Sequence, residues 1–229
     1  MAATFVLVHG AWHGGWCYER VAERLRARGH HVLTPTMTGD TLSGHVAQIV
    51  DVVRNEDVRD AVLCGHSYGG FVISGVVEAV PDRIAALVFL DAFVPGNGQS
   101  LHDLVAEEQR SRQIEAAAAN GGFVPPIPAK FFSVNEADQA YVDSMCVPQA
   151  LATFREGLVL TGARERVPHK TYARAGLHRS IHFDAARDAV TGAPGWTVET
   201  LPGGHDVMLD APDDLTRVLL ETAGRAGLA

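Results

Sequence analysis

The segment Gly65-His66-Ser67-Tyr68-Gly69 places a serine between two glycines, directly after an apolar run and before an apolar helical pattern. Such a sharp turn from strand to helix holds a hydroxyl clear of the backbone. Side chains larger than glycine at the flanking positions would collide with the strand and the helix. The first turn of a helix also presents unpaired N–H groups that favour negative charge nearby. These features indicate a nucleophilic serine at position 67.

A nucleophilic serine needs a base, an acid that orients the base, and an oxyanion hole. His205 lies in a Gly-Gly-His-Asp stretch after the last strand pattern and is the predicted base. Loops at the carboxyl ends of parallel strands meet at one edge of the sheet, which would bring His205 to Ser67. Backbone N–H groups of Tyr68, beside the serine, and of Ala11, in the glycine-rich loop after the first strand, are the expected oxyanion donors.

The sequence leaves three candidates for the acid. The usual position is the loop after the penultimate strand, but residues 176–182 contain no carboxylate. Asp91 ends the strand that follows the serine helix and is the favoured candidate. Asp184 is the reserve, and Asp206 is the third choice because it adjoins the base and would point away from it.

Substrate contacts are expected from Trp12, Phe93 and His9, which flank the predicted site in the sequence. Aromatic side chains suit an apolar pocket, although each alone is more often part of a core. The histidine spacing matches no metal motif, so neither a metal nor another cofactor is expected. Further candidates for the pocket wall are Trp16, Phe131, Phe132 and Tyr141.

Strand and helix patterns alternate through the first 91 residues, which predicts an α/β fold with a doubly wound, mostly parallel sheet. The strands are short continuous apolar runs, as in central parallel strands. The expected strands span 5–8, 31–35, 61–64, 85–90, 170–175 and 196–200, and the expected core helices span 14–28, 41–54, 68–80 and 212–223.

The alternation stops after the strand that ends near Asp91. Helical patterns follow around Leu101–Ala119 and Ala137–Leu160, joined by a proline-rich link, and no strand pattern between them is strong. A small helical cap inserted after that strand is therefore predicted. The predicted division is a core of residues 1–94 and 166–229 and a cap of residues 95–165.

The overall composition and charge argue against several classes of partner and location. The 229 residues carry a net charge of −8, which argues against a nucleic-acid partner. The longest apolar stretches are strand-sized, so no membrane span or membrane partner is expected. Three widely spaced cysteines, and no secretion signal before the first strand, favour a cytoplasmic protein with reduced thiols. The expected partner is a small molecule, and a homodimer is one option for the oligomeric state.

The chain resembles the α/β-hydrolase group that includes plant methylesterases and hydroxynitrile lyases. The segments 5–18, 65–70 and 203–208 look like the opening strand and loop, the serine turn and the histidine loop of that group. Residues 90–95 and 146–153 look more closely like bacterial esterases that hydrolyse the carbamate carbendazim. The resemblance implies a cofactor-free serine esterase that cleaves small carboxylic esters or carbamates through an acyl-enzyme intermediate.

Two departures from that group matter. Hydroxynitrile lyases carry a threonine where Ala11 stands and a lysine where Asp206 stands, so lyase activity is not expected. The group also has a longer loop where Gly39 here joins Asp40 directly; either a loop beside the site has been lost or residues are absent from this sequence. The alternatives to an esterase are a lyase or cyclase without an acyl-enzyme, and a non-catalytic receptor for a small ligand.

Overall fold

The computed structural model describes residues 2–228 and is built around one six-stranded sheet in the order β2-β1-β3-β4-β7-β8. All neighbouring strands in this sheet are parallel. The predicted doubly wound α/β class is confirmed. The strands are β1 Thr4–Val8, β2 His31–Leu33, β3 Ala61–His66, β4 Ile84–Leu90, β7 His169–Ala175 and β8 Trp196–Leu201.

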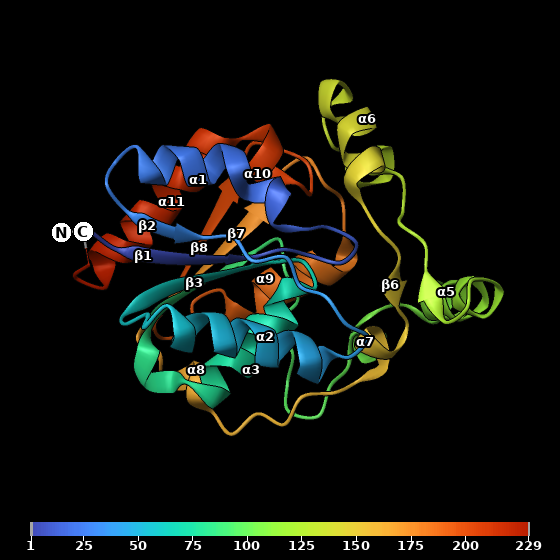
Figure 1. The fold of residues 1–229 in the computed structure, drawn as a ribbon, viewed down its shortest axis with the longest axis horizontal. Helices are drawn as coiled ribbons and strands as arrows, with labels where there is room; N and C mark the ends of the chain where they lie inside the picture. Colours follow the sequence, from blue (N-terminus) through green and yellow to red (C-terminus); the bar gives the residue numbers. More distant parts are fainter. Residues whose placement is uncertain (1, 229) are drawn as a thin grey trace.

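Helices cover both faces of this sheet (Figure 1). One face carries α1 Glu19–Arg26, α10 Val207–Asp210 and α11 Pro212–Arg225, with the turn η1 Gly15–Tyr18 beside them. The other carries α2 Leu42–Asn55, α3 Gly69–Ala79, α8 Ala163–Arg166 and α9 Ile181–Val190, and the turn η2 Pro81–Arg83 joins α3 to β4.

Alternate residues of each central strand enter the two separate cores. In β1, Phe5 and Leu7 pack on the α1 and α11 side, whereas Val6 and Val8 pack on the α2 and α3 side. Successive side chains of a strand point to opposite faces, so a strand that is covered on both sides must be apolar throughout. This explains why the strands read as continuous apolar runs.

The segment 95–165 differs from expectation in two ways. The helix expected over 137–160 is interrupted, because α6 ends at Met145 and Pro148 follows, which has no N–H to continue a helix. A two-stranded antiparallel sheet, β5 with β6, was not predicted. The elements are α4 Leu101–Leu104, α5 Glu107–Ala119, β5 Phe123–Val124, η3 Ala129–Phe132, α6 Glu136–Met145, β6 Gln149–Ala150 and α7 Ala152–Arg155.

Trp12 joins the loop after β1 to this small sheet. Its backbone N–H donates to Gln149 Oε1 at 3.0 Å, and its indole Nε1–H donates to the Val124 carbonyl at 2.9 Å. The N–H of Val147 donates to the carbonyl of Trp12 at 2.8 Å. The loop after β1 is therefore fixed by segment 95–165. The division into a core and a cap stays a prediction.

Within residues 2–228, no helix is both long and apolar enough to cross a membrane.

Candidate active site

Ser67 lies in the turn between β3 and α3 and has φ of +53°. A left-handed conformation is strained for a residue other than glycine and persists only where the surroundings hold it. Here the N–H of Ser67 donates to the Leu90 carbonyl at 3.1 Å, and the Phe93 N–H donates to the Ser67 carbonyl at 3.2 Å. The end of β4 thus holds the serine turn in place.

Two glycines beside Ser67 are required by close backbone approaches. A Cβ on Gly65 would lie 2.5 Å from the carbonyl oxygen of Gly69, and a Cβ on Gly69 would lie 2.8 Å from that of Val8. Neither distance is tolerated without a shift of the backbone. The glycine spacing read from the sequence therefore has the expected steric cause.

His205 and Asp91 meet at the carboxyl edge of the sheet. Asp91 follows β4, has no exposed surface, and accepts a 2.6 Å hydrogen bond at Oδ2 from Nδ1–H of His205, which follows β8. The N–H of His205 donates to the Phe132 carbonyl at 2.8 Å. Asp91 is therefore the carboxylate that the structure brings to the imidazole.

The other two candidate acids have different partners. Asp184 lies in α9 and accepts a hydrogen bond from Arg174 Nε at 3.0 Å. Asp206 accepts one from His13 Nε2 at 2.9 Å. Burial opposes the ionisation of Asp206, but His13 outweighs it and holds the pKa of this carboxyl below its usual value. Within residues 2–228, neither carboxylate accepts a hydrogen bond from the imidazole of His205.

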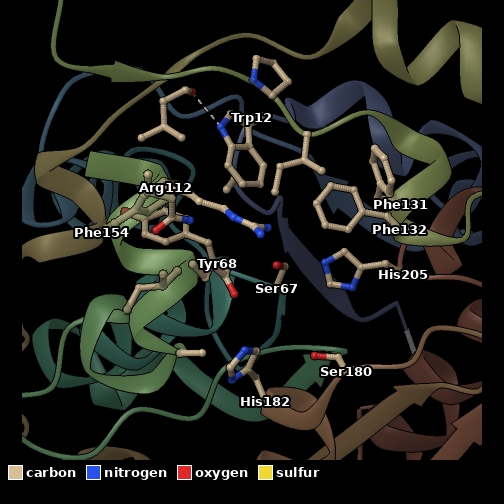
Figure 2. Close-up of a pocket in the computed structure, with 18 of the residues that line it drawn as sticks. Trp12, Ser67, Tyr68, Arg112, Phe131, Phe132, Phe154, Ser180, His182 and His205 are labelled. Carbon is tan, nitrogen blue, oxygen red and sulfur yellow. Dashed lines mark hydrogen bonds between the residues drawn. The ribbon is translucent and has the colours of Figure 1, made fainter. Parts of the chain in front are cut away.

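Ser67 and His205 line the same cavity. In the close-up, Ser67 lies between Tyr68 and His205, and its hydroxyl is directed into the open space (Figure 2). In the described part of the chain this hydroxyl has no hydrogen-bond partner, and the expected bond to His205 is not formed. Bonds between a nucleophile and its base are often loose without substrate and tighten in the complex.

Two backbone N–H groups beside Ser67 are free to bind a negatively charged oxygen. Ala11 and Tyr68 both line the cavity, and neither N–H finds an acceptor anywhere in residues 2–228. Nearly all buried backbone N–H groups in proteins are paired, so two unpaired ones on residues that line the cavity of Ser67 are significant. The N–H of Trp12 is already bonded to Gln149.

The cavity has a volume of about 840 Å³ and lies between the strand ends and segment 95–165. Trp12 and Phe93 line it as expected, and so do Phe131 and Phe132. The close-up shows Phe131 and Phe132 on the His205 side and Trp12 and Phe154 on the other (Figure 2). An apolar wall with a few polar groups is typical of small-molecule sites.

His9 is not among the residues that line this cavity, contrary to expectation. Its Nε2 accepts from the N–H of Met37 at 2.9 Å, and its Nδ1 therefore donates to the Gly10 carbonyl at 2.8 Å. Both ring nitrogens are thus used inside the loop. Trp16 and Tyr141 are also absent from the wall and pack against each other with ring centroids 5.4 Å apart.

Aromatic rings enclose the imidazole of His205. Phe183 stacks on it with a centroid distance of 5.0 Å, and Phe132 lies at 5.2 Å. Burial lowers the pKa of His205, because the charged form loses its water. The charge of Asp206 opposes this only in part, and the charges of His13 and Arg174 lower the pKa of His205 further. The imidazole is therefore neutral at pH 7 and able to accept a proton.

Asp91, His178 and His205 are the one group of potential metal ligands with atoms all within 4.8 Å of one another among residues 2–228. His205 Nδ1 and Asp91 Oδ2 are already joined by their hydrogen bond. The closeness of this group follows from that bond, and His178 packs against His205 with ring centroids 4.9 Å apart.

Sequence reasoning missed Arg174, whose side chain is 4% exposed and contacts Asp91. A signal was present, because a charged residue within a strand that is covered on both faces needs a buried partner. It also missed the buried pair of His13 and Asp206, which come from loops far apart in the chain.

Comparison with known proteins identifies the family. The model of the alpha/beta hydrolase family matches residues 5–218, and the chain belongs to this family. The chain is 42% identical over 237 residues to the carbendazim hydrolyzing esterase of Nocardioides sp. (strain SG-4G), covering 95% of this chain and 98% of that one. The predicted α/β-hydrolase fold is confirmed.

Two further relatives span almost the whole chain. Esterase PIR7B of Oryza sativa subsp. japonica is 27% identical, with 96% of each chain covered. The solved structure of an extracellular alpha/beta-hydrolase from a Paenibacillus species superposes with a TM-score of 0.86 at 25% identity, covering 96% of this chain and 98% of that one.

We expect Gly65→Ala to destabilise the protein by about 1 to 3 kcal/mol, because the new methyl group collides with the Gly69 carbonyl. Urea unfolding measures this change. Gly224→Ala, in α11 with open space around it, is the matched control and should be neutral or slightly stabilising. Equal stability of the Gly65 variant and the wild type would contradict the steric reading.

The imidazole of His205 should titrate below the ordinary value of 6.5, because burial disfavours its charged form. NMR titration of the histidine ring protons, assigned with His205→Gln, measures this pKa. A lowered pKa keeps the imidazole neutral, and hence able to accept a proton, as the pH falls through 6.5. A midpoint above 6.5 would show that the neighbouring carboxylates outweigh burial.

Proposed function

We propose that this protein is a serine esterase that hydrolyses small carboxylic esters or carbamates through an acyl-enzyme intermediate. The observation that carries the proposal is the buried hydrogen bond to Asp91 from His205, which lines the same cavity as Ser67. A serine, an oriented imidazole and two free N–H groups in one apolar cavity meet the requirements of acyl transfer.

In the proposed reaction, the hydroxyl of Ser67 attacks the carbonyl carbon while Nε2 of His205 takes its proton. Asp91 holds Nδ1–H of the imidazole and so keeps Nε2 free to accept. The N–H groups of Ala11 and Tyr68 bind the developing oxyanion, and the loss of one such donor typically costs about 3 kcal/mol in the transition state. His205 then protonates the leaving group and activates water to release the acid.

The substrate class rests on the relatives and on the cavity. The relative with 42% identity is named for hydrolysing carbendazim, a carbamate, and others are esterases. The aromatic cavity wall suits a substrate with an apolar group beside its carbonyl. Hydroxynitrile lyases have a lysine where this chain has Asp206. Here Asp206 is a carboxylate that forms an ion pair with His13, so the cation of the lyases is missing and a lyase is disfavoured.

We also propose a cytoplasmic location. Cys17, Cys64 and Cys146 are all unpaired, and the first two are buried. Free thiols of this kind suit a reducing compartment.

Ser67→Ala should abolish hydrolysis of a p-nitrophenyl ester and labelling by a fluorophosphonate probe, because both need the nucleophilic hydroxyl. Circular dichroism should show an unchanged fold. A panel of esters, carbamates and lactones, with Ser67→Ala as the blank, then defines the substrate class. Turnover that is unaffected by the substitution would end the proposal.

Asp91→Asn should lower kcat by about 10³- to 10⁴-fold, because the neutral amide no longer holds the imidazole in the productive tautomer. Asp184→Asn is the matched control. It removes a carboxylate that contacts Arg174 but not His205, so kcat should change by no more than a few-fold. A larger loss of kcat from Asp184→Asn than from Asp91→Asn would identify Asp184, in α9, as the acid.

A further inference from the structure

Arg174 is a buried cation that binds directly to the proposed acid. It lies on β7, beside β4, and its side chain is 4% exposed. Nη1 donates to Asp91 Oδ1 at 2.6 Å and to the Ala175 carbonyl at 2.8 Å. Nη2 donates to the His178 carbonyl at 2.7 Å, and Nε donates to Asp184 Oδ1 at 3.0 Å. One guanidinium thus spans four acceptors.

The two oxygens of Asp91 have separate partners. Oδ2 accepts from His205, whereas Oδ1 accepts from Arg174 and, at 3.1 Å, from the N–H of Ala175. The guanidinium is itself held by three further acceptors, so the N–H that it directs at Oδ1 of Asp91 has a fixed position. The plane of Asp91, and hence the aim of Oδ2 at the imidazole, is therefore set from the side opposite His205.

The charge balance of this site also depends on Arg174. Burial raises the pKa of Asp91 above its usual value, and Arg174 is the largest influence that opposes the rise. A carboxyl that held its own proton could not stabilise the imidazolium that forms at His205 during the reaction.

We propose that Arg174 is a positioning residue for the hydrolysis, which holds Asp91 ionised and aimed at His205. This inference rests on the proposed function of Ser67, His205 and Asp91. Arg174 itself touches neither the substrate nor the reacting atoms. It acts through the carboxylate that it binds.

The other titratable groups that face Asp91 cannot replace Arg174. His66 from β3 and His178 from the loop after β7 influence the carboxylate when they are charged. Burial lowers the pKa of both imidazoles, that of His178 to about 4, so both are neutral near pH 7. Tyr172 of β7 is buried and holds its proton, because burial raises the pKa of its phenol.

Asp184 binds the guanidinium of Arg174 at a different nitrogen from the one that binds Asp91. It accepts from Nε of Arg174 and also pairs with Arg187 Nη1 at 3.2 Å. Its side chain is 44% exposed, so water screens its charge. Asp184 therefore steadies the guanidinium without competing with Asp91 for the buried charge.

The test is the pH profile of kcat/KM for a p-nitrophenyl ester. Arg174→Met removes the cation, so the pKa of Asp91 rises, the pKa of His205, which Arg174 also lowers, rises with it, and the acid limb of the profile moves up by about 1 to 3 pH units. The loss should therefore be greater at pH 6 than at pH 9, by up to about 10-fold for each unit that the limb moves. Arg174→Lys keeps the charge and should leave the acid limb at nearly the same pH. The maximum kcat/KM should be lower, because lysine cannot reproduce the hydrogen bonds of the guanidinium. Arg187→Met should leave the whole profile unchanged.

A purely structural role for Arg174 would give a different result, namely an equal loss at every pH. That outcome, with the acid limb unmoved in Arg174→Met, would overturn the inference. If Arg174→Met does not fold, the comparison between Asp91→Asn and Asp91→Asn/Arg174→Met decides. Removing both members of a buried ion pair is better tolerated than removing one.

In the Asp91→Asn background, Arg174→Met should change kcat/KM by less than about 3-fold, because Arg174 acts through Asp91. A further large loss would refute the inference. Ser67→Ala separates this outcome from failure of the proposed function. If the wild type hydrolyses the ester and Ser67→Ala does not, the proposed function stands whatever the Arg174 variants show.

Discussion

The hydrogen bond between Asp91 and His205 is the interaction on which the site depends. It joins residues that are 114 positions apart, and both partners are almost completely buried. It forms only because β4, β7 and β8 are consecutive neighbours in the sheet. That order brings the carboxylate after β4, the guanidinium on β7 and the imidazole after β8 to one edge. The sheet order thus sets both the geometry and the charge balance of the site.

The local features of this fold were predictable from the sequence. The parallel strands appear as apolar runs because both faces of the sheet are covered. The turn at Ser67 is recognisable from its flanking glycines, which are required because a larger side chain would collide with the backbone. His205 was predictable because it follows the last strand. Asp91 was favoured over Asp184 from position alone, and the structure separates them by their partners, His205 for the first and Arg174 for the second.

The features that the sequence did not reveal depend on contacts between distant segments. The strands β5 and β6 have two residues each, too short for a strand pattern, and they bind Trp12 on the loop after β1. The helix expected through residue 160 ends at Met145, where the chain turns to bond with that loop. His9 lies close to the site in sequence but uses both ring nitrogens within its own loop.

The position of the acid has a consequence for the cavity. Because the carboxylate comes from the end of β4, the loop after β7 does not have to supply it. That loop and the first turn of α9 instead contribute His178, Ser180 and His182 to the cavity wall. Figure 2 shows Ser180 and His182 there. Arg174 holds the carbonyl of His178 with the same guanidinium that holds Asp91. The shape of the cavity and the aim of the proposed acid therefore depend on one buried side chain.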